Sequence, residues 1–189
     1  MAGPDGTFGN RFDDPEGAYR VLYASSQRLG CFLETLARFR VDIKLYAELT
    51  EIAGDNDYFP LGRCRPNGPN VAQLARLLTT VSMADINGSE WIGRLRRELA
   101  RDCVRLGIAD VDVSILQGSA PRSLTQRASR IVYNAGFDGV CYYSRYGNEI
   151  RNWGLFEPFK LEPQGTSDVT TDDPDFQKAL QIHGLQVRS

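Results

Sequence analysis

Histidine is the scarcest residue of this chain of 189 amino acids, because His183 is the only one. One imidazole does not suffice for a zinc site with several histidine ligands, and it argues against a triad built on histidine. His183 lies near the C-terminus, in a segment that we expect to be peripheral, so we predict it to be a surface residue. Catalysis would then depend on carboxylate, arginine, tyrosine and serine side chains.

The chain also lacks a large excess of basic over acidic residues, or of acidic over basic ones. The chain has 22 basic and 24 acidic residues, a formal net charge of −2, and no long run of either sign. Nucleic-acid binding relies on clustered Lys and Arg that neutralise phosphates, so we do not expect nucleic acid as a direct partner. The most basic stretch, residues 94–101, mixes arginines with acidic residues and is typical of a solvated helix face.

Long apolar runs and paired cysteines are absent as well. No stretch is apolar over the length that a bilayer requires, and the polar N-terminus lacks the apolar region of a secretory signal. The four cysteines are scattered without a C-x-x-C pair, which indicates reduced thiols in the cytoplasm. The sequence thus predicts a cytoplasmic protein that uses neither a membrane nor a metal ion, and it leaves the oligomeric state open.

Periodicity and turn signals predict a mixture of strands and helices. Their order lacks the regular alternation of a doubly wound parallel sheet, which favours an α+β fold. We expect one domain over residues 1–163, followed by a linker and a short helix over residues 164–189. The expected strands are residues 20–24, 76–83 (where a helix is the alternative), 110–116, 137–144 and 153–161, and the expected helices are residues 25–39, 42–53, 89–106, 123–135 and 174–182, with a loop over 54–70 and a turn over 145–152.

Two groups of polar and aromatic residues are candidates for a site, since no phosphate-binding glycine loop or nucleophile elbow occurs. The first group is Arg11, Tyr23 and Glu34. Its structural alternative is an ion pair of Glu34 with Arg38 across one helical turn. The second group lies in the stretch YYSRYGNEIRNW, residues 142–153. Its structural alternative is a hairpin whose aromatic side chains stiffen a sheet. Periodicity alone favours the structural interpretation of the first group and does not decide between the two interpretations of the second.

Three motifs follow one another along the chain. The first is GNRFDDPEG with YRVLYAS and CFLETLARFR, the second is SLTQRASRIVYNAGFDGVCYYSR, and the third is NWGLFEP. Over residues 8–159 this succession resembles the RES domain family, the toxins of RES–Xre toxin–antitoxin pairs. The resemblance implies an ADP-ribosyltransferase-like fold, with a small mixed or antiparallel split sheet and helices around an NAD cleft. It further implies cleavage of the nicotinamide–ribose bond of NAD as substrate, by hydrolysis or phosphorolysis, and an Xre-type antitoxin as partner.

Matched motif by motif, the functional residues of the family fall on Arg11, Tyr23, Glu34 and Ser144. Cleavage of the glycosidic bond develops positive charge on the ribose, which a carboxylate such as that of Glu34 stabilises. The resemblance implies that Arg11 pairs with a pyrophosphate or ribose oxygen and that Tyr23 stacks on nicotinamide. Ser144 would bind the ribose or the carboxamide. Two neighbours complete the expected binding residues, Arg145 and Asn152.

Two alternatives remain at this point. Some RES proteins transfer ADP-ribose to protein, so mono-ADP-ribosyltransferase activity is one alternative. The other is a RES-like domain that binds a nucleotide or a partner without turnover. Family members often carry a further strand before the G-R-F segment, whereas ten residues precede Arg11 here. This difference favours the non-catalytic alternative.

Overall fold

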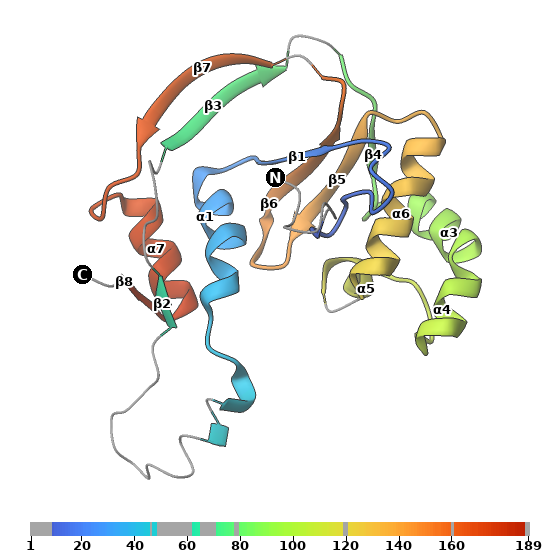
Figure 1. Ribbon diagram of the computed structural model, residues 1–189, viewed down its shortest axis with the longest axis horizontal. Coiled ribbons are helices and arrows are strands. Elements are labelled where there is room, and N and C mark those ends of the chain that lie inside the picture. The colour runs from blue at the N-terminus through green and yellow to red at the C-terminus, as the bar shows by residue number, and fades with distance from the viewer. Residues whose placement is uncertain are drawn as a thin grey trace. The chain divides into compact units, whose positions relative to one another are not determined.

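The computed structural model in Figure 1 is an α+β structure whose chain divides into two compact units. The first unit contains residues 1–26 and 76–162, and the second contains residues 27–75 and 163–189. The structure describes residues 9–45, 47–48, 62–64, 71–77, 80–118, 121–159 and 161–187, with the backbone alone over 62–64 and 71–77.

The first unit is built on a four-stranded sheet with the order β1-β6-β5-β4. The pairs β1–β6 and β5–β6 are antiparallel, whereas β4 pairs with β5 in parallel. The sheet is therefore mixed, and the predicted α+β class is confirmed. The strands are β1 (Val21–Ser25), β4 (Met83–Asp85), β5 (Gly139–Ser144) and β6 (Gly147–Phe156).

Helices cover one side of this sheet (Figure 1). They are α3 (Ser89–Glu98), α4 (Ala100–Leu106), α5 (Val113–Gln117) and α6 (Arg122–Asn134). Leu95 and Leu99 from the helical segment and Val132 from α6 are fully buried with Val140 of β5. Burial of such side chains at about 25 cal/mol per Å² is the main force that holds helices on a sheet.

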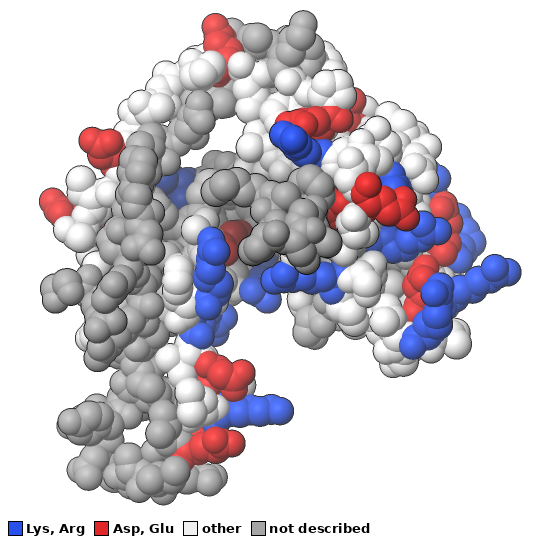
Figure 2. Space-filling model, in the orientation of Figure 1, with Lys and Arg blue, Asp and Glu red and all other residues white. Residues whose placement is uncertain are grey.

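The outer side of α3 and α4 is charged, as the sequence predicts for residues 94–101. Arg94 pairs with Glu98 at 2.7 Å, and Arg105 pairs with Asp102 at 2.8 Å. Figure 2 shows basic and acidic side chains next to one another over this part of the surface. Such exposed pairs add little to stability but keep the helix face solvated.

The second unit pairs residues that are far apart in the sequence. Helix α1 (Arg28–Leu36), extended by a single 3₁₀ turn over Ala37–Phe39, packs on α7 (Pro174–His183). Strand β2 (Gly62–Cys64) runs parallel to β8 (Leu185–Val187). A second pair consists of β3 (Val71–Leu77) and β7 (Leu161–Asp168).

Several expected elements are confirmed by the structure. Strand β1 and helix α1 with its 3₁₀ turn occupy residues 21–39, and the expected helix at 89–106 forms as α3 and α4. The helix expected over 123–135 forms as α6, and the glycine expected to stop it, Gly136, has a φ of 81°. The terminal helix begins at Pro174, as predicted.

Other expectations are wrong, and local capping explains one of them. Residues 110–116 alternate like a strand, but α5 forms there because the Asp112 carboxylate accepts the N–H of Ile115 at 2.8 Å. The turn expected over 145–152 is shorter, because β6 already begins at Gly147. The strand expected over 153–161 is the second half of β6, which ends at Phe156.

Three further segments differ from expectation or lie outside the described residues. The segment 76–83 contains the end of β3 and the start of β4 instead of one element. The expected linker from residue 164 contains most of β7. The helix expected over 42–53 and the loop over 54–70 lie largely outside the described residues, apart from β2 and a few helical residues between 43 and 48. The domain boundary after residue 163 stays a prediction.

The expectation that His183 is a surface residue is wrong. Only 7% of it is exposed, and its Nε2 lies 2.8 Å from the backbone oxygen of Leu33. The sequence position suggested a peripheral residue, but α7 folds onto α1 and buries the imidazole. As for membrane spans, none of the helices in the described part of the chain has the length and apolar character to cross a bilayer.

Candidate functional site

Three expected site residues lie on neighbouring strands of the first unit: Tyr23 on β1, Asn152 on β6 and Ser144 on β5. In the register, Asn152 stands between Ser25 on one side and Tyr142 on the other. Residues directly opposite each other share a face of a sheet, and residues two apart along a strand share it too. Tyr23 and Ser144 each lie two positions from a neighbour of Asn152. Tyr23 therefore shares the face of Asn152. Ser144 follows Tyr142 on β5 after a register irregularity between Tyr143 and Ser144, which brings Ser144 opposite Gly147 of β6.

The hydroxyl of Tyr23 is held from two sides. It donates to Oδ1 of Asp13 at 2.9 Å and accepts the N–H of Phe12 at 2.9 Å. Burial of the hydroxyl raises the pKa of Tyr23, and the negative charge of Asp13 raises it further. The hydroxyl thus stays a neutral donor, while the residue as a whole is 36% exposed. The aromatic ring, rather than the hydroxyl, is the part that can meet a ligand.

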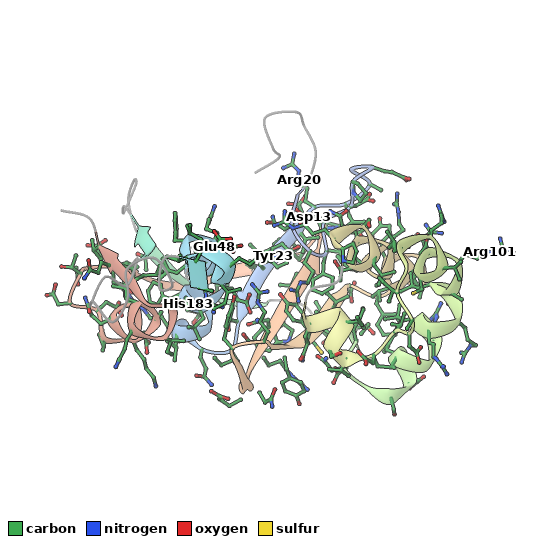
Figure 3. The ribbon with its side chains drawn as sticks, turned by 90° about the horizontal axis from the view of Figure 1, so that it is seen from below. Asp13, Arg20, Tyr23, Glu48, Arg101 and His183 are labelled. Atoms are coloured by element: carbon green, nitrogen blue, oxygen red, sulfur yellow. The ribbon has the colours of Figure 1, made fainter. Side chains whose placement is uncertain are left out.

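Asp13 is a residue of this site that the sequence alone did not single out. It is only 4% exposed, and besides Tyr23 its carboxylate accepts the N–H of Asn10 at 2.8 Å. Figure 3 shows the labelled Asp13 and Tyr23 close to each other. The signal in the sequence was the acidic pair directly after Arg11 and Phe12. A carboxylate in that loop is needed to fix the tyrosine that follows ten residues later.

Arg11 is anchored at the C-terminal end of α5. Its guanidinium donates to the backbone oxygens of Leu116, Gln117 and Gly118 at 3.1, 2.7 and 3.2 Å. Carbonyl groups at the end of a helix lack partners within the helix, so a cation there satisfies them. The side chain is half-buried, and these contacts fix the plane of its fork.

The loop around Arg11 is tied to α6. Phe12 is fully buried, and its backbone oxygen accepts the hydroxyl of Ser129 at 2.7 Å. Asp14, which is 1% exposed, accepts the N–H of Ala18 at 2.6 Å and lies 3.3 Å from Arg130 of α6. The loop is therefore a rigid part of the first unit, and it presents Arg11 in a fixed position.

The residues expected on the β5–β6 hairpin differ in exposure. Ser144 is 1% exposed, and its Oγ accepts the N–H of Tyr146 at 3.1 Å. Asn152 is 2% exposed, whereas Arg145 in the turn is exposed and stacks over the ring of Tyr146 at 4.9 Å. The structure thus brings Ser144 and Asn152 into the interior and leaves Arg145 at the surface.

A second polar group lies on the opposite face of the same strands. Two of its residues, Tyr143 and Arg151, belong to the candidate stretch 142–153, but the sequence did not single them out. The guanidinium of Arg151 stacks over Tyr143 at 5.0 Å, donates to its hydroxyl at 3.1 Å and reaches Asp85 at 3.3 Å. The backbone N–H of Arg151 donates to Oγ of Ser26 at 3.0 Å. These contacts join β4, β5 and β6, and the residue that follows β1, at the end of the sheet that carries Ser144 and Asn152.

Glu34 lies in the second unit, on α1. The residues that this helix buries are Gly30, Leu33 and Leu36, whereas Glu34 is exposed. The expectation that Glu34 avoids the core face is thus confirmed. Arg38, its partner in the structural alternative, donates through Nε to the backbone oxygen of Thr35 at 3.3 Å. That Glu34 acts together with Arg11 and Tyr23 stays a prediction.

A family model described as the RES domain matches residues 1–177. The chain belongs to the RES domain family. A chain from the crystal structure of the M. tuberculosis MbcT–MbcA toxin–antitoxin complex has a similar fold, with a TM-score of 0.51. The two chains are 12% identical, and the similarity covers 93% of this chain and 77% of the other. None of the curated proteins matches the sequence.

Two further observations concern metal ligands and thiols in the described part of this RES domain. Among the described residues, no group of three or more His, Cys, Asp or Glu side chains is arranged to hold a metal ion. Burial raises the pKa of Cys103 and of Cys141, which keeps both thiols protonated and poorly nucleophilic.

Proposed function

We propose that this RES domain cleaves the nicotinamide–ribose bond of NAD, as a glycohydrolase or phosphorylase, and that it is the toxin of a toxin–antitoxin pair. Family membership over residues 1–177 supports the proposal. The observation that carries it is the common sheet face of Tyr23 and Asn152, with the buried Ser144 at the end of the neighbouring strand β5. On that face the Tyr23 hydroxyl is fixed by Asp13 while its residue remains 36% exposed, as a stacking role requires.

The proposed reaction needs little acid catalysis. The bond between the ribose C1′ and the nicotinamide nitrogen breaks, and its electron pair stays on that nitrogen, so nicotinamide leaves as a neutral molecule. Positive charge develops on the ribose, and the carboxylate of Glu34 stabilises it. Water or phosphate then attacks C1′, and water loses a proton in that step. This chemistry suits a chain whose one histidine is buried between two helices.

The remaining residues bind and orient the substrate in this proposal. The α5 carbonyls fix the guanidinium of Arg11, whose planar fork then pairs with a pyrophosphate or ribose oxygen. The ring of Tyr23 stacks on nicotinamide. Ser144 hydrogen-bonds the ribose or the carboxamide, and Asn152 and Arg145 contribute polar groups beside it.

The experiment is an incubation of the purified protein with NAD, with and without phosphate. Free nicotinamide and labelled protein are followed over time. Release without labelling supports glycohydrolase or phosphorylase activity, and dependence on phosphate separates the two. Labelling of a protein would instead support mono-ADP-ribosyl transfer. A folded protein that releases no nicotinamide under any condition would overturn the enzymatic proposal and leave a non-catalytic binding domain.

Glu34→Gln tests the carboxylate. The change keeps the size of the side chain and removes its charge, so nicotinamide release should fall by at least about 100-fold, as for other lost transition-state stabilisers. Because Glu34 is exposed, the melting temperature should stay nearly the same. Glu48→Gln is the matched control, an exposed glutamate of the same unit, and should keep full activity. A large loss of stability in Glu34→Gln would support a structural role instead.

The proposed toxin role is supported by the similar fold in a toxin–antitoxin complex. An Xre-type antitoxin is the expected partner, and it would act by blocking access to the NAD-binding residues. Expression of the protein in cells should deplete NAD and arrest growth, and coexpression of the product of the neighbouring gene should restore both. Expression of Glu34→Gln should neither deplete NAD nor arrest growth. This variant therefore separates the effect of NAD loss from a general burden of expression.

A further inference from the structure

Helix α1, which carries Glu34, cannot be stable by itself. It has nine residues, and its N-cap, Gln27, makes no side-chain hydrogen bond to the first turn. Isolated helices shorter than about 12 residues are marginal in water even when their sequence favours helix. The orientation of Glu34 therefore depends on whatever α1 packs against.

That support is α7, the helix near the C-terminus. Phe32 of α1 meets Phe176 of α7 edge to face, with 5.6 Å between the ring centroids. The two helices bury side chains against each other, and among the described residues of the second unit this is the most extensive contact between two elements. The buried residues are Gly30, Leu33 and Leu36 on α1, and Phe176, Ala179, Leu180 and His183 on α7.

Polar contacts tie both ends of α1 to this support. At the N-terminal end, Arg28 forms a salt bridge with Asp173, and its Nη1 donates to Oγ of Ser167 at 2.6 Å. Asp173 also caps α7 by accepting the N–H of Phe176 at 3.1 Å. The ion pair thus fixes the start of α1 to the start of α7.

At the other end, the contact is made by His183. Its Nε2 lies 2.8 Å from the backbone oxygen of Leu33, so Nε2–H donates and the carbonyl accepts. That carbonyl also accepts the N–H of Ala37, and its two lone pairs allow both bonds. The carbonyl of Leu33 belongs to the same peptide group as the N–H of Glu34. The bond therefore fixes the peptide plane from which Glu34 projects.

We propose that His183 is a positioning residue for Glu34, which it holds through the Leu33 carbonyl. This inference rests on the proposed function, since it assigns Glu34 a role at the ribose. The family match ends at residue 177, so the contact between His183 and the Leu33 carbonyl is a feature that the match does not cover. The proposal assigns a role to the one histidine of the chain, whose imidazole is buried away from solvent.

The test compares two substitutions of His183 in the full chain. His183→Leu keeps an apolar volume but has no donor, and displacement of a reacting group by about 1 Å can cost about 100-fold in rate. We expect kcat for nicotinamide release to fall by roughly 10- to 100-fold, with KM changed less than about threefold. His183→Gln carries an amide donor at a similar distance and should recover most of kcat. Lys178→Ala, an exposed change on α7, is the control and should leave both constants unchanged.

Amide hydrogen exchange provides a readout that does not depend on activity. His183→Leu should speed exchange of the amides of residues 34–37, whereas α6 in the other unit should exchange as before. Unchanged exchange around Glu34, or faster exchange with unchanged kcat, would overturn the positioning role. If the parent protein releases no nicotinamide, the proposed function is contradicted. The exchange rates then still show whether His183 stabilises α1. Equal loss of kcat in the Leu and Gln variants would also contradict the proposal.

Discussion

At the scale of one residue, the two ends of the Tyr23 side chain lie in different surroundings. The hydroxyl is fixed by Asp13 and by the N–H of Phe12, while 36% of the residue is exposed. Periodicity predicted a tyrosine on a strand, and the resemblance to the RES family predicted a stacking role. Neither predicted Asp13, because a carboxylate in a loop carries no periodic signal that would relate it to a strand.

Tyr23→Phe should separate the two ends. The change removes two hydrogen bonds and leaves the buried Asp13 with fewer partners, so the free energy of unfolding should fall by about 1–3 kcal/mol. The ring remains, and KM for NAD should rise by less than about threefold if stacking is its role. Denaturant unfolding and steady-state kinetics measure these effects.

Tyr133→Phe is the matched control for Tyr23→Phe. Its ring stacks on Tyr19 at a centroid distance of 4.3 Å, and among the described residues no hydrogen bond of its hydroxyl is found. Stability should change by less than about 0.5 kcal/mol, as for substitutions away from networks. A loss in the Tyr133 variant as large as that in Tyr23→Phe would contradict the assigned role of Asp13.

Tyr19 predicts an effect of alkaline pH on stability. It is 3% exposed and shares a hydrogen bond with Ser129 at 2.8 Å, and burial raises its pKa to about 12. Above pH 10 the unfolded chain loses the phenolic proton while the folded protein keeps it, so stability falls as pH rises toward 12. Over that range the parent should lose about 2 kcal/mol relative to Tyr19→Phe, since one pKa unit is about 1.4 kcal/mol.

Denaturant unfolding of both proteins at pH 8, 10 and 12 measures this difference. Arginines, lysines and the other tyrosines titrate in both proteins and cancel in the comparison. Parallel pH profiles of the parent and the Tyr19→Phe variant would contradict a raised pKa of this tyrosine.

At the scale of elements, glycine and capping residues decide where helices end. The sequence predicted the stop of α6 from Gly136, because a glycine after a periodic segment is typical of a helix C-terminus. It missed α5, where the alternation of residues 110–116 is the pattern of a strand. The capping bond of Asp112 and the Arg11 contact at the far end of α5 favour the helix there.

Gly136→Ala should shorten or strain the end of α6. The φ of Gly136 is 81°, a value that costs an L-residue with a side chain about 1–2 kcal/mol, although no atom lies within 4 Å of an added Cβ. The loss should therefore come from the backbone alone. Thermal or denaturant unfolding measures it.

Gly165→Ala is the control, because it also meets nothing within 4 Å and its φ lies outside the left-handed region. Alanine at a compatible position lowers the entropy of the unfolded chain, so this variant should be neutral or up to about 1 kcal/mol more stable. Equal effects of the two alanines would show that φ is not the cause.

At the scale of the whole molecule, each compact unit is assembled from two separate stretches of chain. Residues 27–75 fold with residues 163–189, so α1 depends on a helix about 150 positions away in the sequence. The chain thus passes three times from one unit to the other. Loss of the α1–α7 contact would affect the helix of Glu34 without removing any residue that binds NAD in the proposal.

Binding of NAD should stabilise the whole chain even where turnover is blocked. Glu34→Gln binds substrate without consuming it in the proposal, so its melting temperature should rise with NAD concentration. At about 100 times Kd the stabilisation amounts to about 2.7 kcal/mol. Thermal unfolding with increasing NAD measures the shift. The same titration with Arg11→Ala in the Glu34→Gln background should show a much smaller shift, and equal shifts would contradict the role of Arg11.

The sequence by itself determined the features that local patterns encode. Apolar spacing located α1, α3, α4 and α6, and glycine and proline marked helix ends. Three ordered motifs identified the RES family. The roles of Arg11, Tyr23, Glu34 and Ser144 stay predictions. These features depend on neighbours within a few positions or on residues that a family pattern retains.

Tertiary structure alone decided the contacts between residues far apart in the chain. It buried His183 against the carbonyl of Leu33, made Asp13 the partner of Tyr23, and placed Arg11 at the end of α5. The physical reason is that these bonds need a donor and an acceptor whose distance is set by packing. No periodicity in the sequence specifies that distance, so a lone histidine was predicted at the surface and is found supporting the helix of Glu34.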